Sequence, residues 1–277
     1  MIAYHDGAWL DETGIRVAAR DAAFLSGHGV FESLRLHERA YFRLDAHLER
    51  LAGSAALLRI PLPQRAELRA VLIELARRAD VDEASARVTV TAGEPGGAPS
   101  VVASISPLPH DWMERAARGW RLIVARTRHP APETVPPALK SLGRVYSVLA
   151  RQEASDAGVD DALMLLPDGT VAEGPTWNFF FRHDGVLHTA STDVVLGGVT
   201  RAVILDAAAE RGIDLDVGRP HADLLLHADA AFVSMSSLGV VPVVELDGRP
   251  LAGSLELAAP LQQAYWSLVR GETRGAA

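Results

Sequence analysis

Strand-like and helix-like patterns of apolar residues alternate along the first 110 residues. "VFESLRLHERAYFRL" (30–44) is rich in aromatic and branched residues on both sides of Glu38-Arg39, which predicts two strands around a turn. Apolar residues at helical spacing follow, with Asp45 as the predicted cap and Pro61 just beyond the end. "QRAELRAVLIELARRAD" repeats the helical pattern. "ARVTVTA" and "SVVASIS" predict two further strands around the loop "GEPGGAP".

The second half of the chain shows more strands and more hairpin turns. "WRLIVA" predicts a strand, and a stiff connection follows it because four prolines lie between Pro130 and Pro137. A helix is expected from about residue 140 to Gly158. Turns at 168–169 and 184–185, each Asp-Gly, predict two hairpins. "LGGVTRAVILDAAAERG" predicts a glycine loop entering a helix; strand "AAFVSMS", hairpin "VVPVVELDGRPL" and a helix over 255–270 complete the chain.

This order of elements predicts a mixed α/β (α+β) protein with two domains and a cleft between them. The hairpins argue against an all-parallel sheet. We expect a small N-terminal α/β domain over residues 1–118, a connection over 119–130, and a larger domain over 131–277. A length of 277 residues is compatible with one large domain or two ordinary ones.

Composition and charge narrow the functional classes. The chain is 48% hydrophobic and 22% charged, as expected of a soluble protein with a sizeable core. Its net charge of −8 argues against nucleic acid as the main partner. The absence of cysteine excludes disulfides, thiolate metal ligands and a cysteine nucleophile, and the ten histidines show no metal-like pairing. No signal peptide or membrane span is evident, so we expect a cytoplasmic enzyme without a metal.

Lys140 is the single lysine among 27 lysine and arginine residues. An ammonium group can lose its proton and attack a carbonyl, whereas a guanidinium stays protonated. Lys140 is therefore a candidate for a Schiff base. The alternative is that an arginine-rich composition left one lysine at the surface by chance.

A Schiff-base lysine can act on a carbonyl substrate directly or hold pyridoxal 5'-phosphate, and three further features bear on that choice. The "GGVTR" segment (197–201) offers the free amides of a helix start to a phosphate, although it also reads as an ordinary capped helix. Arg50 could hold the phosphate or be a solvated helix charge. Glu173 could face the cofactor's ring nitrogen or solvent.

The order and spacing of four segments are more specific. "YFRLDAHLERL", "LKSLGR", "ARQEASDAGVDDALMLLPDGTVAEGPTWNFFF" and "GVLHTASTDVVLGGVTRAVI" together resemble the class IV pyridoxal-phosphate aminotransferase family. That family includes branched-chain and D-amino-acid aminotransferases, (R)-selective amine transaminases and 4-amino-4-deoxychorismate lyase. The resemblance runs from about residue 20 to about 250. It implies the two-domain fold type IV, with a small N-terminal domain, a barrel-like C-terminal domain and a homodimer.

The resemblance also implies roles for single residues. Lys140 matches the cofactor lysine, Arg50 the phosphate-binding arginine, and Glu173 the acid facing the pyridine nitrogen. Leu196 matches the residue on the ring face. The remaining phosphate contacts match Val199, Thr200 and Ser236.

Several positions depart from the family pattern and concern the substrate. The loop "VTAGEPGGAPS" has Ala92 where D-amino-acid aminotransferases carry a carboxylate-binding arginine, so that type of enzyme is not expected. A tyrosine common in the small domain is Phe31. The candidate substrate residues are therefore Phe31, Arg126, Arg128 and Ser237, where the two arginines could instead form ion pairs.

The function implied is transfer of an amino group between an amino acid or amine donor and a 2-keto acid acceptor, with pyridoxal phosphate as cofactor. The alternative is 4-amino-4-deoxychorismate lyase, which makes 4-aminobenzoate and pyruvate. Arginine four residues after the lysine, as in "KSLGR", occurs in that branch, whereas Glu32 stands where the lyase tends to have threonine. A binding protein without catalysis would have no need of Lys140.

Overall fold

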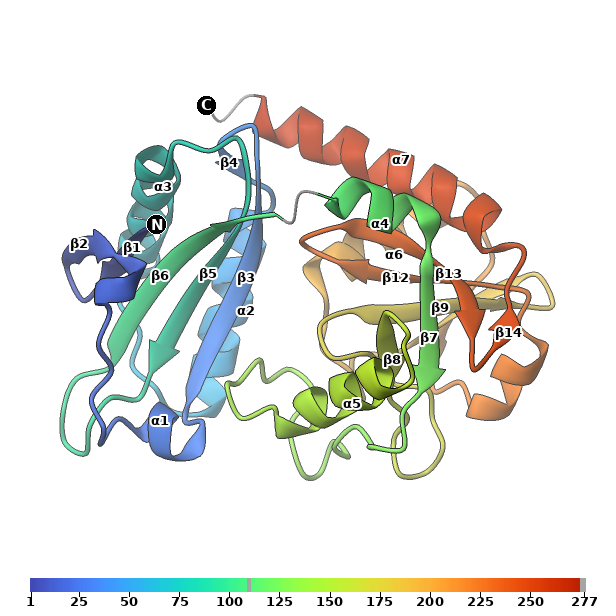
Figure 1. Ribbon diagram of the computed structural model, residues 1–277, viewed down its shortest axis with the longest axis horizontal. Helices are drawn as coiled ribbons and strands as arrows, with labels where there is room; N and C mark the ends of the chain where they lie inside the picture. The colour runs from blue at the N-terminus through green and yellow to red at the C-terminus, as the bar shows by residue number, and fades with distance from the viewer. Residues whose placement is uncertain (109–110, 275–277) are drawn as a thin grey trace. The chain divides into compact units, whose positions relative to one another are not determined.

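Two β-sheets organise the chain, and each forms the centre of one compact unit (Figure 1). The computed structural model describes residues 1–108 and 111–274. Unit 1 contains the described residues of 1–109, 138–144 and 268–277, and unit 2 those of 110–137 and 145–267. The chain therefore passes between the units several times. The predicted division at 118/119 and 130/131 stays a prediction, because units defined by contacts need not be domains that fold independently.

The sheet of unit 1 is antiparallel throughout, with strand order β2-β1-β6-β5-β3-β4. Its strands are β1 (Ile2–His5), β2 (Ala8–Asp11), β3 (Gly29–His37), β4 (Ala40–Tyr41), β5 (Glu83–Thr91) and β6 (Ser100–Pro107). The predicted turn between β3 and β4 is confirmed: Glu38 and Arg39 both have positive φ angles.

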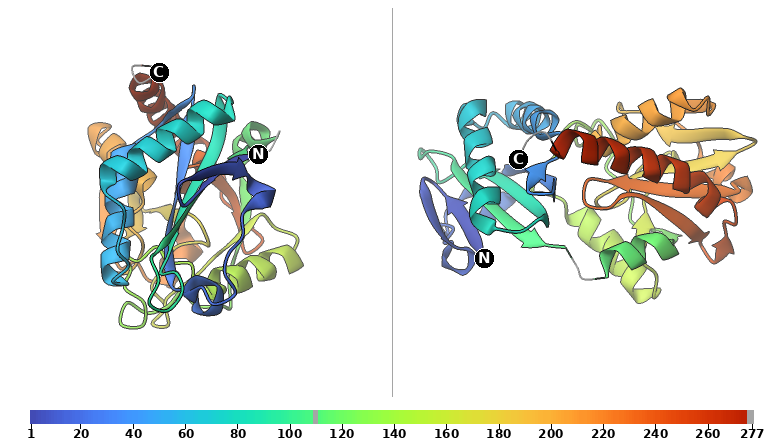
Figure 2. Two further views of the ribbon diagram at one scale, coloured as in Figure 1. Left: turned by 90° about the vertical axis from the view of Figure 1, so that its left-hand side faces the viewer. Right: turned by 90° about the horizontal axis from the view of Figure 1, so that it is seen from above.

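Helices α2 (Leu44–Leu57) and α3 (Arg65–Ala79) pack side by side on one face of this sheet (Figures 1 and 2). Alternate strand residues such as Leu34, Val88 and Ile105 point into the core that the helices cover, and they are fully buried. The intervening residues, among them Phe31 and Arg87, therefore occupy the opposite face of the sheet. The short helices α1 (Ala22–Ser26) and η1 (Glu12–Gly14) complete the unit.

The prediction that Asp45 caps α2 is wrong. Arg43 occupies the N-cap position with φ 54° and makes no side-chain cap hydrogen bond. The Asp45 carboxylate lies in the first turn and accepts a hydrogen bond of 2.9 Å from Arg69 Nη1 of α3. An acidic residue in the first turn still favours the helix, because it faces the positive end of the helix dipole.

The sheet of unit 2 is mixed, with strand order β11-β10-β9-β12-β13-β7-β8 and β14 paired with β13. β7 runs parallel to both β8 and β13, and β10 runs parallel to β11; the other pairs are antiparallel. The strands are β7 (Trp120–Val124), β8 (Asp161–Leu163), β9 (Asn178–His183), β10 (Val186–Ala190), β11 (Leu215–Gly218), β12 (Ala230–Met235), β13 (Gly239–Leu246) and β14 (Arg249–Pro250).

Helices pack on several strands of this second sheet. Helix α4 (Trp112–Arg118) contacts β13, α5 (Val145–Asp156) contacts β8, and α6 (Val199–Glu210) contacts β12. The 3-10 helix η2 (Ala222–His227) lies next to β9, and α7 (Ser254–Thr273) ends the described chain. The mixed α/β class and the hairpin at 184–185 are thus confirmed. No helix within residues 1–108 and 111–274 is both long enough and apolar enough to cross a membrane.

We predict that the aromatic pair between β9 and β12 is a main contributor to the stability of unit 2. Phe180 and Phe232 are cross-strand partners with ring centroids 4.7 Å apart, and both are fully buried. Phe232→Ala should lower the free energy of unfolding by about 3–5 kcal/mol, measured by urea denaturation. Leu226→Ala, in an exposed position of the same unit, should change it by less than about 0.5 kcal/mol. Equal effects of the two substitutions would contradict this account of the core.

Candidate functional site

The main chain of Lys140 is fixed by hydrogen bonds to β3 and α2. Phe31 N donates to Lys140 O (3.1 Å), and Lys140 N donates to Ser54 Oγ of α2 (3.1 Å). Leu142 N donates to Gly29 O at 2.9 Å. The segment therefore runs along β3 as a short bridge, although the sequence predicted that Lys140 begins a helix. That prediction is wrong, because α5 begins only at Val145.

Two glycines of "GHGVF" make this close approach possible. Gly27 has φ +71°, and a side chain there would meet the Gly143 Cα at 2.8 Å. A side chain at Gly29 would meet Leu142 Cδ1 at 2.6 Å. Gly27 ends α1 and Gly29 begins β3, so the segment is a turn leading into a strand.

The side chain of Lys140 lies over an aromatic ring that a second cation also covers. Lys140 Nζ is 4.9 Å from the centre of the Phe31 ring, and Arg87 Cζ is 3.7 Å from the same centre. Arg87 lies on β5, where Phe31 pairs with Thr89 and Ser33 pairs with Arg87. Arg87 could not be recognised from the sequence, because only the pairing of β3 with β5 brings it next to Phe31.

Arg50 forms a buried ion pair with Glu32 in unit 1. Arg50 Nε donates to Glu32 Oε1 (2.7 Å) and Arg50 Nη2 donates to Glu32 Oε2 (2.7 Å), while His47 Nδ1 lies 2.8 Å from Glu32 Oε2. Helix α2 presents His47 and Arg50 on one face, since they are three residues apart. Glu32 projects from β3 toward them and is fully buried.

Arg50 and His47 determine the protonation of this carboxylate. Burial acts to raise the pKa of Glu32, but the hydrogen bonds and charges of Arg50 and His47 outweigh it and lower the pKa to about 2. Burial lowers the pKa of His47, the Glu32 carboxylate acts in the opposite direction, and the charges of Arg50 and Lys140 lower it further. Glu32 is thus an anion close to the cationic groups of unit 1. Neither Glu32 nor His47 was assigned to this site from the sequence.

Glu173 has several hydrogen-bonding neighbours within unit 2. Its Oε2 accepts from Asn178 Nδ2 at 2.9 Å and from the main-chain N of Leu196 at 3.3 Å. His129 Nε2 lies 3.4 Å from Glu173 Oε1. The Asn178 amide also donates to Leu196 O (2.9 Å), so a single side chain links Glu173 to the loop that contains Leu196. Nothing in the sequence assigned Asn178 or His129 to this site. Their contacts with Glu173 are visible only in the folded structure.

The start of helix α6 follows this loop directly. Its N-cap is Gly198, which makes no side-chain cap hydrogen bond, and Val199 and Thr200 form the first turn. A side chain at Gly198 would meet Asn178 Oδ1 at 2.0 Å, so the residue that holds Glu173 also requires glycine here. An uncapped helix start with close backbone access is suited to bind an anion. Thr200 is buried and Val199 is half-buried.

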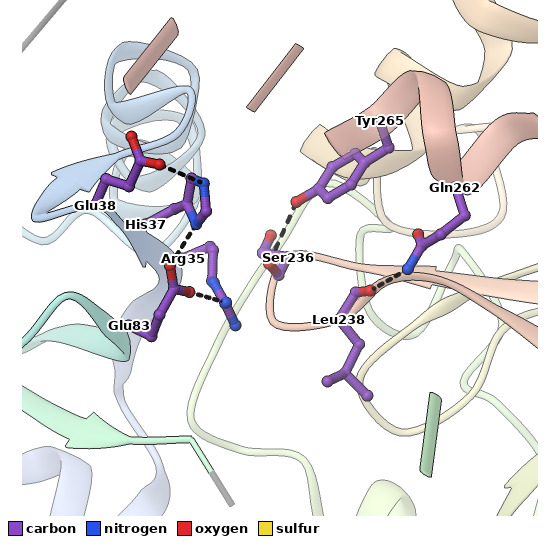
Figure 3. Close-up of polar contacts among 8 residues, drawn as sticks. All are labelled: Arg35, His37, Glu38, Glu83, Ser236, Leu238, Gln262 and Tyr265. Atoms are coloured by element: carbon purple, nitrogen blue, oxygen red, sulfur yellow. Dashed lines mark hydrogen bonds and ion pairs between the residues drawn. The ribbon is translucent and has the colours of Figure 1, made fainter. Parts of the chain in front are cut away.

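Ser236 and Ser237 lie in the turn that joins β12 to β13, and both are half-buried. The turn begins directly after Met235 and ends at Gly239, which has φ +74°. Figure 3 shows Ser236 and Leu238 of this turn beside the helix α7 residues Gln262 and Tyr265.

The two arginines proposed from the sequence as substrate ligands have other surroundings. The Arg126 side chain is 94% exposed, and its Nε lies 3.6 Å from Glu153 Oε2 of α5. Arg128 Nη1 donates to Ala125 O at 3.4 Å, a contact within its own loop. Both residues belong to unit 2, as do Ser236 and Ser237, whereas Phe31 belongs to unit 1.

The comparisons with known proteins agree in the family they indicate. The family described as amino-transferase class IV matches residues 29–246. The branched-chain-amino-acid aminotransferase of Pseudomonas aeruginosa is 33% identical over 263 residues, covering 89% of this chain and 86% of that protein. The aminodeoxychorismate lyase of Bacillus subtilis is 30% identical over 256 residues, covering 88% and 86%.

Solved structures extend the likeness to the fold and the cofactor. The branched-chain aminotransferase of the thermophilic archaeon Thermoproteus uzoniensis, with norvaline, superimposes with a TM-score of 0.90 at 28% identity. The alignment covers 98% of this chain and 95% of that one. Other similar aminotransferases have been solved with pyridoxamine 5'-phosphate or with pyridoxal phosphate. The chain therefore belongs to the amino-transferase class IV family and is a pyridoxal-phosphate-dependent aminotransferase.

Proposed function

We propose that this aminotransferase moves the amino group between an amino acid with an apolar side chain and a 2-keto acid, and that Lys140 carries the proton. The observation that carries the proposal is the position of the one lysine. Its main chain is fixed by β3 and α2, and its Nζ lies over the Phe31 ring that Arg87 also covers. A fixed amine and a guanidinium that contact the same aromatic ring provide a base and an anion-binding group in one part of unit 1.

Pyridoxal phosphate supplies an aldehyde that can bond covalently to an amine and a ring that accepts electrons from the substrate carbon. The side chains suit this group. The uncapped start of α6 at Val199 and Thr200, together with Ser236 and Arg50, would hold the phosphate. Glu173, oriented by Asn178, would accept a hydrogen bond from the ring nitrogen and keep that nitrogen protonated, and Leu196 would pack on the ring face.

Glu32 is then a positioning residue for Arg50. It accepts two hydrogen bonds from the guanidinium, which restricts the orientation of the arginine that would bind the phosphate. Because Glu32 stays ionised, the guanidinium keeps this orientation at neutral pH.

Arg87 would bind a carboxylate of the substrate. In the loop after β5, Ala92 takes the place of an arginine that other family members use, so the carboxylate needs a different cation. Arg87 lies on the sheet face that also carries Phe31, and its guanidinium and the Lys140 amine contact the same Phe31 ring. Arg126 is a weaker candidate, since its side chain lies in solvent beside Glu153.

An apolar substrate side chain is supported by the aromatic ring of Phe31 and by the branched-chain relatives. Phe31 presents no hydroxyl group at a position where a tyrosine is common, so it favours an apolar neighbour. The P. aeruginosa and T. uzoniensis proteins are branched-chain aminotransferases by name, and the second was solved with norvaline, an amino acid with an apolar side chain.

The lyase reaction on 4-amino-4-deoxychorismate is the second candidate, supported by the spacing of Lys140 and Arg144 and by the B. subtilis relative. Formation of pyruvate from that substrate without any keto-acid acceptor would favour the lyase. Consumption of a 2-keto acid with production of the matching amino acid would favour the aminotransferase.

We also propose a homodimer in the cytoplasm. Helix α1 exposes Phe24 and Leu25 with 72% and 67% of their surface accessible, and adjacent exposed apolar side chains favour contact with another chain. The homodimer was predicted from the family resemblance, and these two residues support it.

Replacing Lys140 with arginine should abolish turnover. The substitution keeps the positive charge but removes the group that can lose and regain a proton, so the rate should fall by at least about 10³-fold. Borohydride reduction followed by peptide mapping should attach a pyridoxyl group to residue 140 in the wild-type enzyme only. An active Lys140→Arg enzyme would refute the role given to this residue.

Arg87→Ala should raise the KM for the 2-keto acid by about 10- to 100-fold, because a charge-assisted hydrogen-bonding partner of the carboxylate is lost. Arg126→Ala is the matched control and should leave KM within about twofold, since that side chain is exposed. The opposite result would assign the carboxylate to Arg126.

Glu32→Gln should destabilise the protein at neutral pH and remove part of its sensitivity to acid. A carboxyl whose pKa falls from 4.5 to about 2 on folding stabilises the folded state above pH 4.5 and loses that contribution as the pH falls toward 2. The shift corresponds to about 3 kcal/mol at pH 7. Urea denaturation between pH 7 and pH 3 would measure both effects.

Glu74→Gln is the control for that measurement. The pKa of Glu74 is also lowered to about 2, by hydrogen bonds from Arg77 and Arg78, but the pair lies at the surface of α3. Solvent screens such pairs, so a smaller change is expected. If Glu32→Gln retained full stability and an unchanged pH dependence, the Glu32–Arg50 ion pair would not stabilise the folded protein.

A further inference from the structure

Helix α7 holds the turn between β12 and β13 with side-chain hydrogen bonds to its main chain (Figure 3). Gln262 Oε1 accepts from Val240 N at 2.6 Å, and Gln262 Nε2 donates to Leu238 O at 3.2 Å. The Tyr265 hydroxyl donates to Ser236 O at 3.4 Å. We call Gln262 and Tyr265 the α7 clamp.

Close packing adds to these hydrogen bonds. Gly239 has φ +74°, and a side chain there would meet Tyr265 Cδ1 at 2.6 Å and Gln262 Oε1 at 2.7 Å. Tyr265 is fully buried. The clamp therefore fills the space beside the turn and determines the direction of the main chain from Ser236 to Val240.

We propose that the α7 clamp positions the main chain of the Ser236-Ser237 turn for binding the cofactor phosphate. The inference rests on the proposed function, in which Ser236 contacts that phosphate. N–H and O–H donors bind an anion more tightly when they already have the right orientation, because no ordering cost is then subtracted from the binding energy. Gln262 and Tyr265 contact the turn from α7 and act through it, so they are positioning residues.

The same contacts would be present if the clamp only stabilised the hairpin, and Ser254 separates the two explanations. Ser254 is also a fully buried residue of α7, and its Oγ accepts from Ala231 N of β12 at 2.9 Å. It therefore joins the same helix to β12, the strand that leads into the turn, but at the end of that strand remote from Ser236. Ser254→Ala removes a similar hydrogen bond without touching the turn.

The test compares Gln262→Leu with Ser254→Ala in the full-length protein. The dissociation constant of pyridoxal phosphate is measured by titrating the cofactor-free enzyme, and the ³¹P chemical shift of the bound phosphate is recorded. Gln262→Leu should raise the dissociation constant by about 10-fold and move the ³¹P resonance. Ser254→Ala should leave the dissociation constant within about twofold and the resonance in place, although both variants unfold at a lower temperature than the wild type.

Tyr265→Phe provides a second, milder variant that keeps the ring packed against Gly239. It should change the dissociation constant in the same direction by about two- to threefold, because only the hydroxyl contact is lost. If Gln262→Leu and Tyr265→Phe both match Ser254→Ala in affinity and ³¹P shift, the clamp is structural only and the inference is overturned. That result would leave the proposed function intact, whereas a wild-type protein that does not bind pyridoxal phosphate would refute both.

Discussion

The attachment of the Lys140 main chain to β3 is the constraint on which the rest of the site depends. An amine on a four-carbon side chain can reach many places, so its chemistry is useful only if its Cα is fixed. Hydrogen bonds from Phe31 N and to Ser54 Oγ fix it from two elements, and Gly27 and Gly29 leave room for the segment to approach. Without these hydrogen bonds, the loop that contains Lys140 would be free to move.

This attachment also brings several positive charges into one part of unit 1. Lys140 and Arg50 lie near His47, and burial together with these two charges lowers the pKa of that histidine. The fully buried carboxylate of Glu32 is the counter-ion of Arg50, and it also lies within hydrogen-bonding distance of the His47 ring. Removing a buried counter-ion is costly because the remaining charges are left without compensation. The same carboxylate thus serves stability and the orientation of Arg50.

The proposed anion-binding groups of unit 2 are main-chain groups, whereas those of unit 1 are charged side chains. The start of α6 offers N–H groups, and the Asn178 side chain ties Glu173 to the loop before that helix. Gly198 is required because Asn178 occupies the space that a side chain would take. In the turn between β12 and β13, the α7 clamp fixes further main-chain groups, those of Leu238 and Val240. Arrangements of this kind bind anions without placing further cations in the core.

The sequence determined the features that depend on near neighbours and on residue chemistry. Asp184-Gly185 forms the predicted hairpin turn because both residues adopt positive φ angles, and the single lysine identified the candidate for a reactive amine. The helical spacing of apolar residues placed Arg50 on a predicted helix, and the family resemblance implied that it binds the cofactor phosphate. Only the tertiary structure decided the pairing of β3 with β5, which puts Arg87 over Phe31. It also decided the contact between Glu32 and Arg50, which are 18 residues apart in the sequence. Strand register and helix packing minimise the exposure of the whole apolar surface, so the contacts of one residue depend on partners that its local sequence does not contain.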